Sequence, residues 1–188
     1  MDRAAVAAGA GDPPDTVFRS DCADLPYVLR FYYAWKRGLP FTYVQDVSPR
    51  GRSRDIRYSP RGNQVEARRD VLSGKDALSV LETLRDAISS ATYRILPEQE
   101  GDDLYSPALA PRAIRPGTAI YDPNGHLAVI WKIEDDGRIR YIDAHPDNSL
   151  TAAPMTGGLS APPPAWARAS RIGARSGWWA LARHPTVC

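Results

Sequence analysis

The chain has 188 residues, of which 43% are hydrophobic and 24% charged, a composition typical of an ordinary globular protein with one hydrophobic core. The formal net charge of +2 is too small to point to nucleic acid as a partner, and no apolar run is long enough to suggest a membrane span. Two cysteines, Cys22 and Cys188, exclude a disulfide-rich scaffold but leave a single disulfide between them open.

Residues 1–17 are mostly small, and we expect them to form a flexible arm. They lack the long apolar stretch of an intact signal peptide. If they are the remnant of a processed signal, the protein is expected to be exported or periplasmic, and otherwise cytoplasmic. We expect residues 18–188 to form one domain.

The first predicted helix covers residues 24–37, where apolar side chains recur on one broad face. Pro26 must lie in its first turn, Gly38 is a stop signal, and Asp24 is expected to cap it. Cys22 stands directly before this helix. It is either a small buried hydrophobe or a nucleophile at a helix N-terminus, although Asp21 and Asp24 would raise the pKa of its thiol.

Residues 41–47 alternate like a short strand, and the pattern then breaks. Seven arginines and three acidic residues lie between Arg50 and Asp70. Residues 48–73 therefore predict a solvated insertion, with a surface for anionic polymers, such as cell-wall polymers or nucleic acid, as the alternative. Few aromatic residues are interleaved to stack bases, which favours the solvated insertion.

A second helix is predicted over residues 76–91, because apolar residues recur there at steps of four and three. Ser73 and Asp76 resemble a capping box before it. Residues 97–116 are expected to be loop-like.

The most informative stretch predicts an antiparallel meander of three strands, over 118–121, 126–133 and 138–145. If Glu134–Gly137 is a four-residue connection, Ile133 pairs with Arg138. The same register then pairs His126 with His145 and places Asp143 on the same face. Further on, Pro162–Pro164 opens a Pro/Trp-rich C-terminal segment, where Trp178 and Trp179 are expected to pack on the core or to line a sugar or peptide groove.

These residues fit the chemistry of a thiol nucleophile. A neighbouring imidazole activates a thiol, and a third group fixes the orientation of that imidazole. His126 would be the imidazole, and Asp143 or His145 the third group. The backbone N–H of Cys22 would donate to the oxyanion. A zinc site from these four residues can be drawn, but no short ligand spacing supports it, so we expect no metal and no cofactor.

Two stretches resemble the papain-like cysteine hydrolase superfamily. The segment RPGTAIYDPNGHLAVI is similar to the PGD…GHVAI segment of NlpC-type cell-wall peptidases, whose His is the catalytic base. The segment SDCADLPYVLRFYYAWKRGLPF resembles the GDCEDYA…LGIP segment of bacterial transglutaminase-like cysteine peptidases. The third residue of the second branch is an Asp, which suits Asp143. In the first branch it is often a His, which suits His145. Asp24 stands where NlpC-type enzymes usually have Gly.

The resemblance implies an α+β fold in which the nucleophile helix packs on an antiparallel sheet. It also implies an insertion at about 48–113, because the 104 residues from Cys22 to His126 are more than either branch usually has. It also implies a cysteine peptidase or amidase that cleaves a peptide or amide bond, with cell-wall peptide as one candidate substrate. Cys22 would be the nucleophile, His126 the base, and Asp143 or His145 the orienting residue. Two alternatives are a non-catalytic cell-wall or polymer binding module on the same fold and a transglutaminase-like acyl transferase.

Overall fold

The structure is a computed structural model that describes residues 18–71, 76–96, 99–107, 113–122, 125–155 and 172–173. It is a mixed α+β fold with antiparallel sheets, as the sequence predicts. The described elements, in chain order, are α2 (Leu25–Lys36), β1 (Phe41–Pro49), η1 (Ile56–Tyr58), β2 (Asn63–Val71), α3 (Ala77–Ala87), η2 (Ser90–Arg94), β3 (Leu104–Tyr105), β4 (Ala119–Tyr121), β5 (Leu127–Ile133), β6 (Ile139–Ala144), β7 (Leu150–Pro154) and β8 (Ile172–Gly173).

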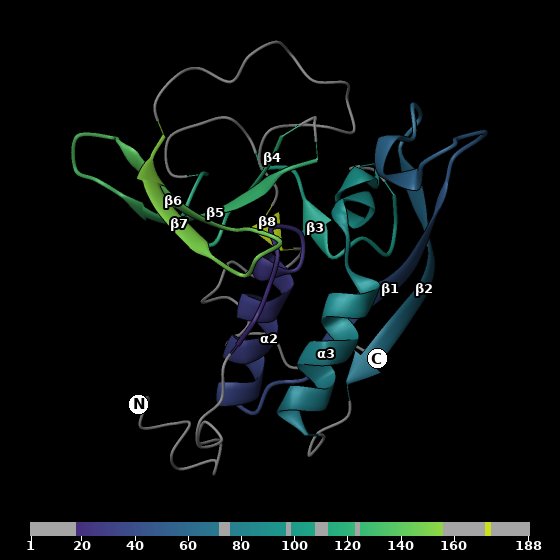
Figure 1. The fold of residues 1–188 in the computed structure, drawn as a ribbon, viewed down its shortest axis with the longest axis horizontal. Helices are drawn as coiled ribbons and strands as arrows, with labels where there is room; N and C mark the ends of the chain where they lie inside the picture. Colours follow the sequence, from purple (N-terminus) through teal and green to yellow (C-terminus); the bar gives the residue numbers. More distant parts are fainter. Residues whose placement is uncertain are drawn as a thin grey trace.

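The strands form three sheets. One has the order β4-β5-β6-β7, and β1-β2 and β3-β8 are two-stranded. In Figure 1 the four-stranded sheet and the β1-β2 ribbon lie at opposite sides of the molecule, with α2 and α3 side by side below. None of the helices among the described residues is long and apolar enough to cross a membrane.

Helix α2 begins close to the predicted position, but its cap differs from the expectation. The side chain of Asp24 makes no capping hydrogen bond. Instead Oδ1 of Asp21 accepts hydrogen bonds from the backbone N–H groups of Ala23 and Asp24, at 2.8 and 3.2 Å. Cys22 therefore lies in the capped turn that leads into the helix. The helix ends at Lys36 with Arg37 as its C-cap, and Gly38 follows with a φ of 62°, which suits a residue without a side chain.

Helix α3 ends earlier than the predicted residue 91. The side chain of Asp76 caps its start by accepting from the backbone N–H of Ser79 at 2.9 Å. Ser73, the other residue of the expected capping box, lies outside the described residues. At Ile88 the backbone turns extended, and Ser89 then caps the short helix η2. The apolar period continues through Ala91 because η2 buries that residue in the same core.

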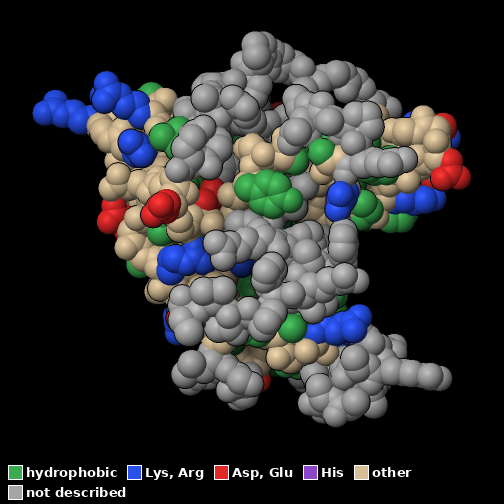
Figure 2. All heavy atoms as spheres, turned by 180° about the vertical axis from the view of Figure 1, so that it is seen from behind, with side chains coloured by type: hydrophobic (Ala, Val, Ile, Leu, Met, Phe, Trp, Pro, Cys, Tyr) green, Lys and Arg blue, Asp and Glu red, His purple; other side chains and the backbone are tan. Residues whose placement is uncertain are grey.

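The stretch 48–73 contains a strand that the sequence analysis does not predict. Strand β2 pairs antiparallel with β1, from Phe41 with Val71 to Pro49 with Asn63. Arginines follow one another on this ribbon because much of it is exposed, so the pattern is polar rather than alternating. Figure 2 shows one group of basic side chains at the tip of the ribbon. Arg50, Arg52, Arg54 and Arg61 are exposed in the segment that joins β1 to β2.

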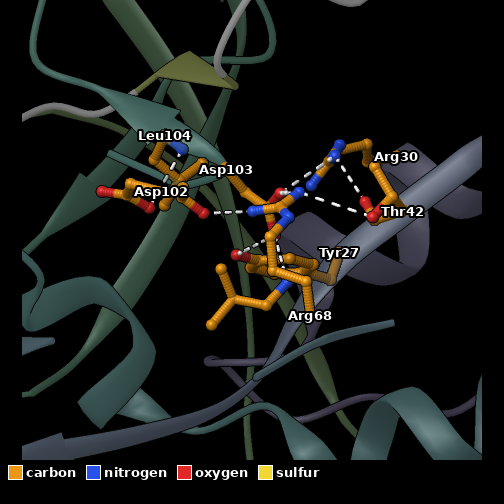
Figure 3. A network of polar contacts seen from close by, with 9 residues as sticks. Tyr27, Arg30, Thr42, Arg68, Asp102, Asp103 and Leu104 are labelled. Atoms are coloured by element: carbon orange, nitrogen blue, oxygen red, sulfur yellow. Dashed lines mark hydrogen bonds and ion pairs between the residues drawn. The ribbon is translucent and has the colours of Figure 1, made fainter. Parts of the chain in front are cut away.

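A buried carboxylate ties this ribbon to α2 (Figure 3). The side chain of Asp103 is 1% exposed, and its Oδ1 lies 2.6 Å from Arg68 and 3.5 Å from Arg30. Its Oδ2 accepts from the hydroxyl of Tyr27 at 3.2 Å and from the backbone N–H of Val44 at 2.6 Å. Two guanidinium groups and two neutral donors thus compensate one buried negative charge.

One hydrophobic core contains side chains of α2, of the stretch 48–113 and of the four-stranded sheet. Tyr27, Val28 and Phe31 of α2 pack in the same cluster as Leu81 and Leu84 of α3. The cluster also contains side chains from β1, η2 and the four-stranded sheet, among them Tyr43, Tyr93, Tyr121 and Leu127. Residues from within 48–113 therefore complete the core under the four-stranded sheet.

In the β5-β6 hairpin the predicted residues are neighbours, although the pairing near the turn differs from the predicted one. Next to the turn Ile133 pairs with Ile139, one residue away from the predicted partner Arg138. A bulge between Ile130 and Lys132 then shifts the register, so that Val129 pairs with Ile142 as predicted. The bulge adds one residue to β5, which offsets the extra residue in the turn.

The described part of the chain beyond β6 contains two strands that the sequence does not predict, β7 and β8. Asp147 and Ser149 form a turn after β6, in which Oδ1 of Asp147 accepts from the backbone N–H of Ser149 at 2.9 Å. Strand β7 then pairs with β6, and β8 pairs with β3. The predictions for residues 1–17, Pro162–Pro164, Trp178, Trp179 and Cys188 lie outside the described residues.

Candidate active site

His126 and Asp143 form the central contact of the site. His126 stands just before β5, and Asp143 lies near the end of β6. Nε2 of His126 is 2.7 Å from Oδ2 of Asp143. The His126 side chain is 46% exposed, whereas that of Asp143 is only 8% exposed. A buried carboxylate therefore holds an accessible imidazole through Nε2, which leaves Nδ1 for another partner.

His145 contacts the same pair of residues but does not form the close hydrogen bond with His126 that Asp143 forms. Its ring stacks on that of His126, with centroids 5.9 Å apart and an interplanar angle of 17°. Its Nε2 bonds Oγ1 of Thr151 at 2.9 Å and is 3.8 Å from Oδ2 of Asp143. The structure thus brings all three predicted residues of the hairpin together, and Asp143, not His145, bonds the His126 ring.

Cys22 reaches the same place from the start of α2. It is a free thiol, partly buried against the core. Burial raises the pKa of this thiol, the backbone N–H of Leu127 lowers it by hydrogen bonding, and the charges of Asp21 and Asp24 raise it further. Leu127 directly follows His126, so the sulfur lies beside the backbone that carries the imidazole. In the described part of the chain, no hydrogen bond joins the Cys22 sulfur to the His126 ring.

Helix α2 is also anchored directly on the sheet that carries the histidines. Leu25 packs with Val129 of β5 and Ala144 of β6 in a small buried cluster. Leu25 lies in the first turn after Cys22, and Ala144 lies between Asp143 and His145. Packing at this one point therefore fixes the cysteine turn relative to the end of the hairpin.

Tyr93 is a positioning residue that the sequence analysis misses. Its hydroxyl donates to the backbone carbonyl of Ala23 at 2.7 Å, next to Cys22 in the chain. Its ring is fully buried and stacks on that of Tyr121, at 6.3 Å and 7°. Tyr93 belongs to η2, where it falls outside the apolar steps that end at Ala91, so no sequence signal marks it.

Asp24, the predicted cap of α2, is instead a buried residue that makes no capping hydrogen bond. The residue is 3% exposed, and Oδ2 lies 3.6 Å from Nε of Arg85. Its Oδ1 is buried and has no hydrogen-bond partner among the described residues. Burial, with added repulsion from Asp21, raises the pKa of Asp24 to about 7.

Within the described ranges, no group of three or more His, Cys, Asp or Glu side chains is placed to hold a metal ion. Comparisons with family models, curated proteins and solved structures give no match to this chain.

Proposed function

We propose that the protein is a papain-like cysteine hydrolase that cleaves a peptide or amide bond. Cys22 is the nucleophile, His126 the general base and later the general acid, and Asp143 orients His126. The observation that carries the proposal is the 2.7 Å contact between His126 and buried Asp143, beside a free thiol at the start of a helix. An imidazole held by a carboxylate on one nitrogen offers the other nitrogen in a fixed direction.

In the proposed reaction, Sγ of Cys22 bonds to the substrate carbonyl carbon while Nδ1 of His126 accepts the thiol proton. The C–N bond then breaks, and the imidazolium gives that proton to the leaving amine. Water attacks the resulting thioester with His126 again as base, which releases the acid and restores the thiol. The raised pKa of Cys22 means that the resting residue is a thiol, so proton transfer accompanies the attack.

The position of Cys22 at the start of α2 assists this chemistry. The backbone N–H of Cys22 lies at the N-terminal end of α2, where it can donate to a developing oxyanion. Contacts between nucleophile and base are often long in the free enzyme and shorten when substrate binds. Peptides of the bacterial cell wall are the substrate that the resemblance to NlpC-type peptidases favours.

The test is acylation of Cys22 by p-nitrophenyl acetate, followed by release of p-nitrophenolate and by peptide mass mapping. We expect acetyl-Cys22 to form, and His126→Ala to slow its formation by about 10²-fold or more, which is the usual contribution of a general base. His145→Ala is the matched control and should lose less. Equal acylation rates in folded wild type and His126→Ala, or no acylation of Cys22, would refute the proposal.

A further inference from the structure

An acidic pocket lies beside the cysteine turn. It is an open pocket of about 420 Å³, and its charged lining consists of Asp21, Asp24, Glu82, Arg85 and Asp86. The turn after His145 closes another side with Pro146 and Asn148. The pocket therefore touches both chain segments that flank the candidate site, the residues around Cys22 and those that follow His145.

The charges in this pocket do not balance. Four carboxylates face one guanidinium, that of Arg85. Asp24 supplies a second and independent feature, since Oδ1 is buried and unpartnered among the described residues while its side chain is only 4% exposed. A buried carboxylate oxygen without a donor costs free energy, and a cation bound beside Asp24 would reduce this cost.

A compact organic cation fits these features better than a metal ion. None of the acidic clusters in the described parts of the chain has the geometry of a metal site. A primary ammonium group carries three N–H donors and one positive charge, so it can bond or face several of the acidic side chains that line the pocket at once.

We infer that this pocket binds a primary ammonium group of the substrate, next to the bond that Cys22 attacks. The inference rests on the proposed hydrolase function and adds the substrate class, a peptide or amide with a free amine near the cleaved bond. Carboxylates keep a bound amine protonated, and a protonated amine is not a nucleophile. The pocket therefore recognises the substrate and does not supply an amine for acyl transfer.

The test compares three methanethiosulfonates on the full chain with Cys188→Ser: the cationic 2-aminoethyl, the neutral methyl and the anionic 2-sulfonatoethyl reagent. In each case the Cys22 thiolate attacks the sulfenyl sulfur, a disulfide forms, and methanesulfinate leaves. The rate ratio of the cationic to the anionic reagent is divided by the same ratio for N-acetylcysteine amide. This quotient removes differences in intrinsic reactivity.

We expect a quotient of about 10 or more in low salt, because clefts lined by one sign of charge enrich the opposite ion. Asp24→Asn with Glu82→Gln should reduce it at least threefold. The matched control is Asp135→Asn with Asp136→Asn, which removes two exposed carboxylates from the far end of the β5-β6 hairpin and should leave the quotient unchanged.

The outcomes separate the two proposals. If Cys22 reacts readily but the quotient is near 1, or if the pocket and control variants behave alike, the pocket inference is wrong and the hydrolase proposal stands. If Cys22 reacts with none of the reagents, the thiol is inaccessible and both fail. A large quotient that only the pocket variants lose supports the ammonium site.

Discussion

Among the residues of the candidate site, Asp143 carries the carboxylate whose burial is costly. Its carboxylate is buried near the end of β6, where Oδ2 bonds His126 and Oδ1 has no partner among the described residues. A buried carboxylate is costly unless it is paired, so this position is poorly explained by stability alone. In the proposed enzyme this buried carboxylate holds the imidazole of His126 by Nε2, which would explain why it is retained despite its cost in free energy.

We expect Asp143→Ala to slow acylation of Cys22 by p-nitrophenyl acetate about 10²-fold or more, since loss of the orienting group misplaces the base. Asp143→Asn should retain more activity, because its amide oxygen still accepts from Nε2–H. The ordering wild type, Asn, Ala is the measured quantity, with thermal unfolding as the control for folding. If the Asn and Ala variants are equally active and folded, Asp143 does not orient the base.

Asp24 predicts a pH-dependent stability. Its folded pKa of about 7 exceeds its ordinary value of 3.8, so the folded state favours the protonated form. Between these values the folded state binds a proton that the unfolded chain has lost, and stability falls as pH rises. The cost is absent below about pH 4 and complete above about pH 7.

We therefore expect Asp24→Asn to raise the free energy of unfolding at pH 8 by roughly 2 to 4 kcal/mol, since one pKa unit corresponds to about 1.4 kcal/mol. At pH 4 the two proteins should be equally stable. Urea unfolding at both pH values measures this difference. A gain that is equal at both pH values would show that the charge of Asp24 is not the cause.

At the level of elements, Asp21 affects both the stability of the turn before α2 and the reactivity of Cys22. Asp21 caps the cysteine turn through Ala23 and Asp24, and its charge also raises the pKa of Cys22. Asn at this position keeps a capping oxygen and loses the charge, whereas Ala loses both. The two variants therefore separate stability from reactivity.

We expect Asp21→Ala to destabilise the protein by about 1 kcal/mol and Asp21→Asn to change stability by less. Both should lower the pKa of Cys22, seen as faster alkylation by neutral iodoacetamide at pH 8. Urea unfolding and peptide mapping give the two readouts. Equal stability of the Asn and Ala variants would argue that the cap contributes nothing, and an unchanged alkylation rate would remove Asp21 from the electrostatics of the thiol.

The β5-β6 hairpin shows how far the sequence can predict this site. Strand periodicity and the histidine and aspartate positions correctly place His126, Asp143 and His145 together. The loop length is wrong by one, and the bulge at Trp131 restores the register. Neither the turn geometry nor the bulge has a clear sequence signal here. Residues 127–130 of β5 are buried on both faces, whereas Trp131 and Lys132 are both exposed, so the strand does not alternate.

Contacts between distant segments account for the rest of what the sequence could not predict. Strand β2 is stabilised by pairing with β1 and by the ion pair of Arg68 with Asp103, neither of which a local pattern reveals. Tyr93 reaches the cysteine turn only through the folded core. The acidic pocket likewise forms only when α3 lies against that turn.

At the level of the whole molecule, the stretch 48–113 is central to the core rather than added to its surface. Leu84 of α3 and Leu127 of β5 are both fully buried in one cluster. Two segments that share a core can separate only by exposing it, so they should unfold together. The tip of the β1-β2 ribbon, where Arg50 bonds Gly62, is largely exposed and can open alone.

Native-state hydrogen exchange tests this cooperativity. We expect the slowest amides of α3 and β5 to exchange with opening free energies that agree within about 1 kcal/mol, because both require global unfolding. The amide of Arg50 should open at least about 2 kcal/mol more easily. Asp103→Ala, which leaves the guanidinium groups of Arg30 and Arg68 without their carboxylate, should lower both core values together. If α3 opened well below β5, the segment 48–113 would be a separate unit, and the cysteine turn would have to be held by the four-stranded sheet alone.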